Sequence, residues 1–162
     1  MNGGRGDDYI GIIGTGFTSV NGGEGWNTLV FESSDLTLDL SKMGLRVQGF
    51  AQFDLNNQSN HANSDPRDGY SNPTSGNTLA LRLSDVLSQP NGAVGPNSQH
   101  MTILGDGTST VQLDGTSSLA GSNWVVSGQQ SINGVAFDVY YNTAMDASTS
   151  ANLLIQQGVH VI

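Results

Sequence analysis

The sequence predicts an all-β fold, in which a short parallel β-roll continues into a degenerate β-solenoid and is closed by C-terminal antiparallel strands. Three observations lead to this prediction. The chain of 162 residues opens with glycine-rich repeats, short apolar runs then alternate with turn-forming residues, and the longest apolar runs come last. A β-sandwich is the alternative, because convergent strand starts would give similar spacing.

The opening stretch can be divided into three nonapeptides of the type G-G-x-G-x-D-x-U-x, in which U is a large apolar residue. The first, Gly3–Gly11, fits at every specified position. The second, Ile13–Asn21, follows after a slip of one residue and is degenerate, and the third, Gly22–Val30, follows without a gap. Tandem frames are harder to obtain by chance than a single one, so a repeat is favoured over a glycine-rich loop.

This spacing predicts a calcium site. Glycine permits positive φ, so a short turn can direct its carbonyl oxygens at a cation, and a carboxylate in the sixth place adds a hard oxygen ligand that suits Ca²⁺. The sixth place holds Asp8, Thr18 and Asn27 in the three frames. Each frame forms half a coil, so we expect Asp8 and Asn27 to face each other across one ion. Carbonyl ligands are expected from Gly4, Gly6, Gly23 and Gly25. The opposite edge, which carries Thr18, is expected to be empty.

These motifs resemble the repeats-in-toxin (RTX) proteins that Gram-negative bacteria export by type I secretion. Later segments of the sequence resemble the C-terminal end of the giant adhesins of this group, including Asn77–Leu81, Asn133–Tyr140 and Ala151–Ile155. The likeness covers nearly the whole chain. Thr18 and Asn27 depart from the pattern at ligand positions, which leaves the number of bound ions open.

The resemblance implies Ca²⁺ as cofactor, the type I secretion machinery as a partner during export, and a secreted or cell-surface location. It implies a calcium-stabilised structural domain of a biofilm adhesin, which folds when it meets calcium outside the cell, and no enzymatic activity. The alternative is a noncatalytic or glycan-binding module of an extracellular RTX polysaccharide-active enzyme. A surface glycan or host-cell ligand is a further possible partner, and a monomer is expected.

Composition agrees with a cation-binding β protein. Lys+Arg 5 against Asp+Glu 14 gives a net charge of -9, which disfavours nucleic acid and anionic membrane surfaces. With 22 glycines and 12% charged residues, turn-rich β structure is favoured over helices. The chain has no cysteine, so disulfides and thiolate metal sites are excluded. No apolar run is long enough to cross a bilayer.

After the repeats, short strands are expected at Leu29–Phe31, Leu36–Leu40, Val47–Leu55, Leu79–Leu83, Met101–Leu104 and Val111–Leu113. Two echoes favour a solenoid over a sandwich. Asn27-Thr28-Leu29 recurs as Asn77-Thr78-Leu79 at an offset of 50 residues. Gly105–Val111 matches the nonapeptide from its second to its eighth place, with Ser109 in place of Asp.

Ser84–Gln89 is the one segment for which a short helix is expected, with Ser84 as its cap and Pro90 closing it. The polar stretch Asn56–Asn77 is expected to be a loop. Its Asp65 and Asp68 suggest either a second calcium site or an ordinary solvated turn, and the turn is favoured.

The C-terminal part carries the longest strands, Trp124–Ile132, Val135–Tyr141 and Leu153–Ile162. Asn133-Gly134 predicts a tight turn between the first two, and the last two are expected to pair as a hairpin. Such strands would cover the open end of a solenoid. Residues 1–30 are thus expected to form the repeats and 31–162 the continuation and cap, packed as one unit. Because Met1 directly precedes a repeat, an artificial start inside a longer protein is expected.

Other functions find little support. A hydrolase needs paired carboxylates, or a nucleophile with its base, in an ordered setting, and no such pattern occurs in the sequence. Arg5-Gly6-Asp7 spells an integrin-binding tripeptide, but the nonapeptide accounts for each residue. The histidines follow no metal-ligand spacing: His61, His100 and His160. Three aromatic residues suggest a sugar platform, although core packing is favoured: Trp124, Tyr140 and Tyr141.

Overall fold

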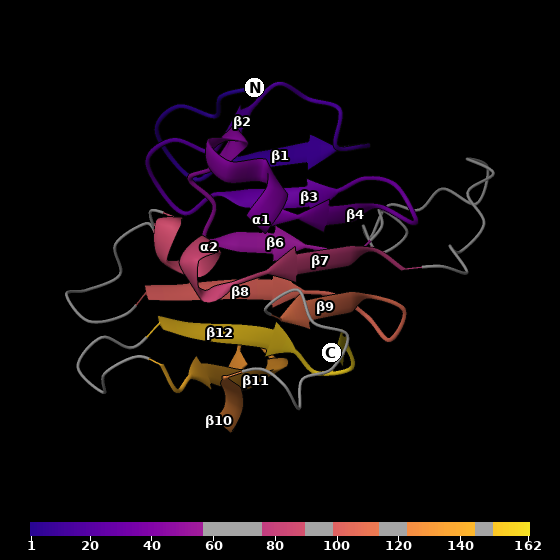
Figure 1. Cartoon of the computed structure of the whole chain (residues 1–162), viewed down its shortest axis with the longest axis vertical. Coiled ribbons are helices and arrows are strands. Elements are labelled where there is room, and N and C mark those ends of the chain that lie inside the picture. Colours follow the sequence, from indigo (N-terminus) through magenta and orange to yellow (C-terminus); the bar gives the residue numbers. More distant parts are fainter. Residues whose placement is uncertain (57–75, 90–98, 114–122, 145–150) are drawn as a thin grey trace.

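A computed structural model describes residues 1–56, 76–89, 99–113, 123–144 and 151–162. Strands predominate among them, with both parallel and antiparallel pairing, and the predicted all-β class is confirmed (Figure 1). The polar loop after Asn56, with Asp65 and Asp68, lies outside the described residues, as does His61. No helix in the described ranges is long and apolar enough to span a membrane.

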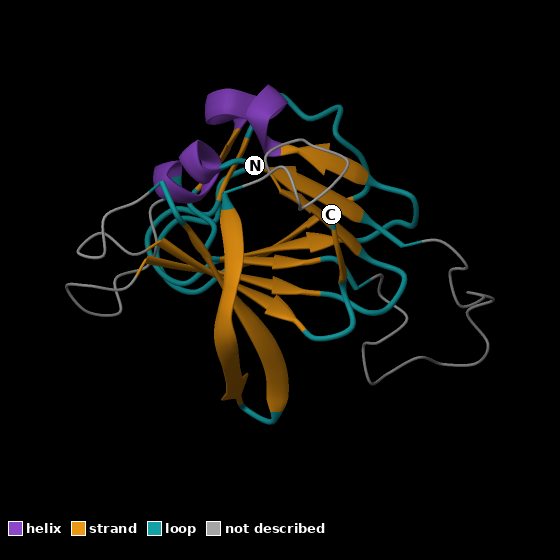
Figure 2. Ribbon diagram, turned by 60° about the horizontal axis from the view of Figure 1, so that its bottom comes forward, coloured by secondary structure: helices purple, strands orange, loops and turns teal. Residues whose placement is uncertain are grey.

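In chain order the strands are β1 (Tyr9–Ile12), β2 (Val20–Asn21), β3 (Thr28–Phe31), β4 (Thr37–Asp39), β5 (Val47–Gln48), β6 (Gln52–Asp54), β7 (Thr78–Leu81), β8 (Gln99–Leu104), β9 (Thr110–Leu113), β10 (Trp124–Ile132), β11 (Val135–Asn142), β12 (Ala151–Gln156) and β13 (His160–Val161). The helical segments are α1 (Leu40–Met43), the 3₁₀ turn η1 (Gly44–Arg46) and α2 (Leu83–Ser88). Figure 2 shows that the helices lie together at one side of the strands.

Within the described residues the strands form one large sheet, in the order β1-β3-β6-β8-β12-β11-β10, and a smaller one, in the order β13-β9-β7-β4. The large sheet is parallel from β1 to β12, and the smaller is parallel throughout. A separate parallel pair joins β2 to β5. Strands β3, β6, β8 and β12 each precede a strand of the smaller sheet, so the chain passes repeatedly from one sheet to the other.

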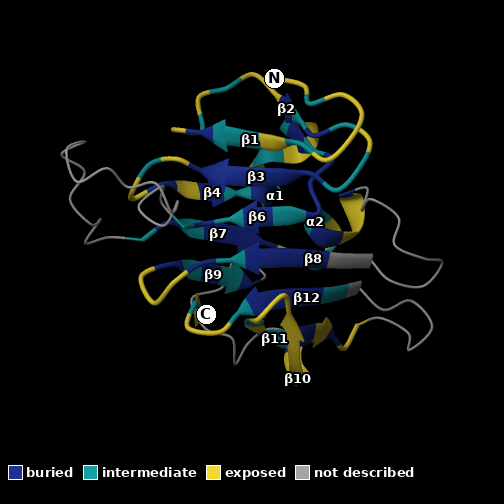
Figure 3. Ribbon diagram, turned by 180° about the vertical axis from the view of Figure 1, so that it is seen from behind, coloured by how far each residue is buried: buried dark blue, intermediate teal, exposed yellow. Residues whose placement is uncertain are grey.

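The core lies between the two parallel sheets. Register places Leu29 beside Phe53 and Phe53 beside Ile103 in the large sheet, and all three side chains are fully buried. In the smaller sheet Leu38 and Val111 flank Leu79 in the same way. These residues belong to one apolar cluster, and Figure 3 shows the burial concentrated in the central strands. Strand alternation therefore points one face of each sheet inward.

Two predicted strands each divide into two. Val47–Leu55 forms β5 and β6, which belong to different sheets, and Gly49 between them has a φ of 78°. Leu153–Ile162 likewise forms β12 and β13, separated by Gly158 with a φ of 101°. Glycine takes positive φ without steric cost, so each glycine lets the chain turn towards the next sheet.

The predicted helix is confirmed as α2, but its cap differs from the prediction. Arg82, not Ser84, is the N-cap residue, and its backbone N–H donates to Oδ2 of Asp85 at 2.8 Å. Burial raises the pKa of Asp85, against the effect of this hydrogen bond. The cap therefore holds a carboxyl group whose charged form is partly desolvated.

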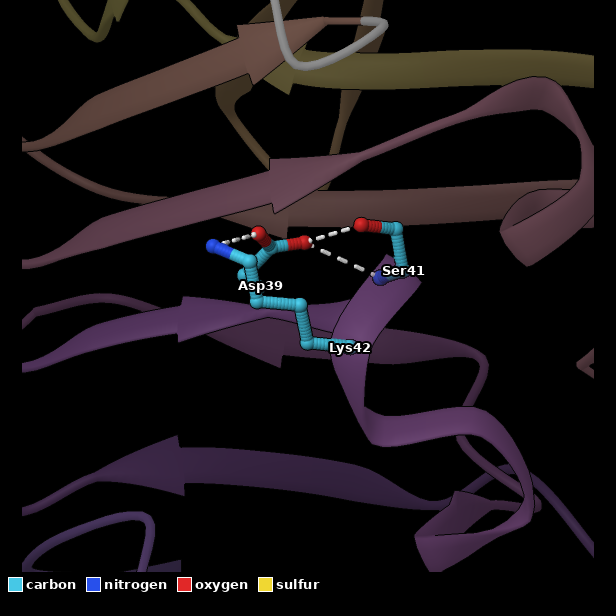
Figure 4. Close-up of polar contacts among 3 residues, drawn as sticks. All are labelled: Asp39, Ser41 and Lys42. Atoms are coloured by element: carbon cyan, nitrogen blue, oxygen red, sulfur yellow. Dashed lines mark hydrogen bonds and ion pairs between the residues drawn. The ribbon is translucent and has the colours of Figure 1, made fainter.

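A second helical segment, α1 with η1, was not predicted. Asp39 caps it by accepting hydrogen bonds at Oδ1 from the backbone N–H of Ser41 at 3.1 Å and from its hydroxyl at 2.6 Å (Figure 4). Lys42 pairs with Oδ2 at 2.9 Å. Burial acts to raise the pKa of Asp39, but the contacts with Ser41 and Lys42 hold it below its ordinary value. This capping pattern, Asp39 followed by Ser41, is the signal that sequence reasoning missed.

The C-terminal strands pair as predicted. Asn133 and Gly134, with φ of 51° and 83°, form the tight turn between β10 and β11. Strands β11 and β12 pair antiparallel. Trp124 and Tyr140 are 3% and 6% exposed, which confirms core packing for these two aromatic residues.

Candidate metal site

The first and third nonapeptides stack directly on each other. The backbone N–H groups of Gly3 and Gly6 donate to the carbonyls of Asn21 and Glu24, both at 2.9 Å, and Glu24 N–H donates back to Gly4 at 2.8 Å. We call residues 3–8 and 22–27 the glycine turns. The turns lead directly into β1 and β3, which pair in parallel with Tyr9 beside Thr28 as their first pair. The structure therefore brings the two sixth-place residues, Asp8 and Asn27, together.

All four predicted carbonyl donors share one backbone conformation. Gly4, Gly6, Gly23 and Gly25 have φ of 104°, 107°, 90° and 115°. A Cβ built on Gly23 would overlap the Gly4 carbonyl, and one on Gly25 would overlap the Gly6 carbonyl. Only glycine therefore allows the two turns to approach this closely.

Asn27 is fully buried and ties three successive turns together. Its Oδ1 accepts from the backbone N–H of Asp8 at 2.9 Å. Its Nδ2 donates to the carbonyl of Gly49 at 2.9 Å and to that of Gly23 at 3.3 Å. A carboxamide oxygen has two lone pairs, so one remains after the bond from Asp8, and the ligand role of Asn27 stays a prediction.

Asp8 carries an oxygen that lacks a protein partner. Its Oδ2 is buried and accepts no hydrogen bond, the one such side-chain oxygen or nitrogen in the described part of the chain. This oxygen and the carbonyl oxygen of Gly22 converge beside Gly3, where each lies 2.5 Å from the position that a Cβ would take. A buried carboxylate oxygen without a donor is destabilising. Oxygen ligands suit a hard cation such as Ca²⁺, so Asp8 and the Gly22 carbonyl fit the predicted ion.

The neighbouring charged groups serve the stacking of the turns. Asp7 accepts at Oδ1 from the backbone N–H of Trp26 at 2.7 Å. Arg5 pairs with Glu24 at 3.3 Å, with both side chains largely exposed. Among the described residues there is no cluster of three or more His, Cys, Asp or Glu side chains, so an ion here would depend on one carboxylate and on backbone carbonyls. Sequence reasoning missed Asp7 because its place in the nonapeptide is unspecified.

The other two nonapeptide-like segments adopt different turns. Gly14 and Gly16 of the second frame, and Gly105 and Gly107 of the later echo, do not take positive φ. In the later echo Asp106 closes the turn itself, because its Oδ1 accepts from the N–H of Thr108 at 2.9 Å and from its hydroxyl at 2.6 Å. The geometry of the glycine turns is therefore confined, in the described residues, to frames one and three.

Asn77 repeats the bridging role of Asn27. Its Oδ1 accepts from the backbone N–H of Leu36 at 2.9 Å, and its Nδ2 donates to the Leu55 carbonyl at 3.0 Å. The two asparagines each precede a strand, although β3 and β7 belong to different sheets. The sequence echo thus marks a shared local role and not a stacked pair.

Comparison with family models, with curated proteins and with solved structures finds no match for the chain. A functional interpretation therefore depends on the residues described above. The most informative of them is Asp8, whose free oxygen points to a ligand.

Proposed function

We propose that the chain is a non-enzymatic, calcium-stabilised domain from the C-terminal region of a large secreted or surface-attached bacterial adhesin. In this proposal the glycine turns and the parallel strands form a β-roll that continues into a β-solenoid, and β10 and β11 protect its last coil. Repeated passage of the chain between two parallel sheets supports this architecture. The domain would be exported by type I secretion and would fold outside the cell.

The observation that carries the proposal is the buried, unpartnered Oδ2 of Asp8 between the glycine turns. Asp8 would hold the ion together with the predicted ligands Asn27, Gly4, Gly6, Gly23 and Gly25, the glycines through their backbone carbonyls. The carbonyl of Gly22, which converges with Oδ2 of Asp8, would be a further ligand. A cation bound only by the folded state stabilises it by mass action, by about 1.4 kcal/mol when its concentration is ten times Kd. Extracellular calcium sites have Kd on the order of 10⁻⁴ to 10⁻³ M, so occupancy would follow exit from the cell.

Calcium titration of the wild-type chain, Asp8→Ala and Glu24→Gln tests the proposal. Circular dichroism melts and titration calorimetry are expected to show a rise in Tm and saturable binding for the wild type. Glu24→Gln is the matched control, because it removes one negative charge from the same turns while its exposed carboxylate pairs with Arg5. It should keep the response, whereas Asp8→Ala should lose it. A wild-type Tm that is the same in millimolar calcium and in a chelator would refute the proposal.

One observation favours the alternative, a glycan-binding module. An open groove of about 830 Å³ has among its lining residues three amide side chains that lie in register across neighbouring turns, from Asn2 through Asn21 to Gln48. Carboxamides both donate and accept hydrogen bonds, which suits a hydroxyl-rich ligand. Calorimetry with a panel of neutral hexasaccharides, on the wild type and on Gln48→Ala, tests this. Absence of binding at millimolar concentration excludes it for that panel.

A further inference from the structure

We propose that the second turn, residues 13–19, contains its own cation: the guanidinium group of Arg46 occupies its carbonyl-lined centre and makes this turn independent of calcium. That calcium stabilises the opposite edge, formed by the glycine turns, rests on the proposed function. The role of Arg46 rests only on the contacts described below. The inference limits calcium to the edge formed by the glycine turns.

Three backbone carbonyls from four consecutive residues converge on the guanidinium. Nη2 donates to the carbonyls of Phe17 and of Thr15, the latter at 3.3 Å, and Nε donates to the carbonyl of Thr18 at 3.2 Å. The group also lies over the Phe17 ring, 5.5 Å from its centroid. A rigid, permanently charged fork of N–H donors satisfies converging carbonyls, as a metal ion does in a carbonyl-lined site.

The fold fixes Arg46 in this place. It is the last residue of η1 and directly precedes β5. Because Val47 pairs with Val20, Arg46 lies beside the end of the second turn. Val47 and Val20 are buried, and Phe17 packs against the core. Both the turn and the residue that fills it are therefore anchored by apolar side chains.

The second turn lacks what the glycine turns offer to a metal ion. Its sixth-place residue is Thr18, which is exposed and has no carboxylate. Gly14 and Gly16 do not have positive φ, and three of the turn's carbonyls already accept from Arg46. A divalent ion would have to displace the guanidinium without gaining a charged ligand. The opposite edge that the sequence predicted to be empty of calcium is therefore filled by a side chain.

Limited proteolysis by chymotrypsin, followed by mass spectrometry, and calcium calorimetry test this, using the wild type, Arg46→Gln, Arg46→Lys and Arg5→Gln. Phe17 is a chymotrypsin site within the turn, and its carbonyl accepts from Arg46. Arg46→Gln should therefore raise the rate of cleavage after Phe17 by about tenfold and lower Tm by about 5–10 °C. The number of calcium ions bound per chain should stay unchanged. Arg46→Lys keeps the charge without the fork, so its effects should be intermediate. Arg5→Gln removes an exposed arginine at the glycine turns and should leave cleavage after Phe17 at the wild-type rate.

The outcomes separate the two proposals. If Arg46→Gln leaves cleavage after Phe17 at the wild-type rate, or changes Tm no more than Arg5→Gln does, the role of Arg46 is refuted. A changed calcium stoichiometry in Arg46→Gln also refutes it. If the wild type binds no calcium, the proposed function fails while the cleavage comparison still decides the role of Arg46. Should Arg46→Gln not fold, the rate of cleavage after Phe17 in Arg46→Lys relative to Arg5→Gln gives the same test.

Discussion

In the first 27 residues, neighbouring turns are joined mainly by backbone hydrogen bonds, whereas from β3 onward neighbouring strands are joined by buried apolar side chains. Ile12 and Val20 are the only fully buried apolar side chains among residues 1–27, all of which the structure describes. From Leu29 to Ile155, by contrast, the core includes Phe31, Phe50 and Phe53 at 0% exposure.

The two regions therefore depend on different forces. Apolar burial stabilises the strands roughly in proportion to area and needs no ligand. The glycine turns depend on backbone geometry, on the amide bridge of Asn27 and, in our proposal, on a cation at Asp8. Regions with few buried apolar contacts open at lower free energy than core strands, so the N-terminal turns should open first.

The largest loss of stability is expected from a substitution in the apolar core. Phe53 lies in β6, an inner strand of the large sheet, is fully buried and contacts Phe50 with ring centroids 6.2 Å apart. Phe53→Ala should lower the free energy of unfolding by about 3–5 kcal/mol, equally with calcium and with a chelator. Urea denaturation under both conditions measures this. Tyr141→Ala, at an exposed site, is the control and should cost much less. A loss that appears only in calcium would break the comparison between the two regions.

The two bridging asparagines sharpen the comparison. Asn27→Ala would leave the N–H of Asp8 and the carbonyl of Gly49 without a partner, and Asn77→Ala would do the same to Leu36 and Leu55. Each should cost about 2–3 kcal/mol, because buried polar groups lose their hydrogen bonds. In hydrogen exchange, Asn27→Ala should act locally on residues 3–27, whereas Asn77→Ala should lower protection of the core strands. Equal, global effects of both variants would contradict the proposed difference.

A smaller effect is expected at a single glycine. Gly23 has a φ of 90° and lies against the Gly4 carbonyl, whereas Gly14 lacks positive φ and has open space at its Cβ position. Gly23→Ala should cost about 1–2 kcal/mol from backbone strain, with an additional cost because the new Cβ would overlap the Gly4 carbonyl, and it should weaken calcium binding in calorimetry. Gly14→Ala is the matched control in the second turn and should be nearly neutral. If the two variants behaved alike, the close stacking of the glycine turns would have no energetic consequence.

Sequence reasoning reached the features that depend on short-range patterns. The nonapeptides identified the four glycines of the glycine turns that have positive φ, because glycine fits these backbone angles without steric cost. Their stacking also predicted that Asp8 lies next to Asn27, whereas an ion between the two stays a prediction. The Asn133-Gly134 turn and the helix at α2 were predictable for the same local reasons. Corners at Gly49 and Gly158 were not, since an apolar run such as Val47–Leu55 reads as one strand whether or not its two halves join different sheets.

The contacts that sequence reasoning missed join residues far apart in the chain. The guanidinium of Arg46 reaches the second turn 28 to 31 positions earlier, and Asn27 reaches Gly49 22 positions later. No spacing rule for a single frame encodes such contacts. The echo between Asn27 and Asn77 was a real signal of a shared bridging role, but it could not indicate that the strands belong to different sheets.

The smallest loss of stability is expected at the turn that the side chain of Asp106 closes. Although burial opposes it, hydrogen bonds from Thr108 and Ser109 lower the pKa of Asp106 below its ordinary value. A lowered folded-state pKa stabilises the fold above the unfolded-state pKa, and this stabilisation is lost as pH falls through the folded-state value. Asp106→Asn should therefore cost about 0.5–1 kcal/mol at pH 7, and the difference from the wild type should shrink below about pH 4.

At Asp85 we expect stability to depend on pH in the opposite direction. Burial raises its pKa, so its ionised form opposes folding at neutral pH and acid relieves this effect. Relative to the wild type, Asp85→Asn should therefore become less stable as pH falls, whereas Asp106→Asn should recover. Urea denaturation of both variants at pH 7 and pH 3 measures the two trends. Parallel trends would mean that the hydrogen bonds at Asp106 do not favour its charged form, and the backbone hydrogen bond from Ser109 to Asp106 would then be the main contact that holds its turn.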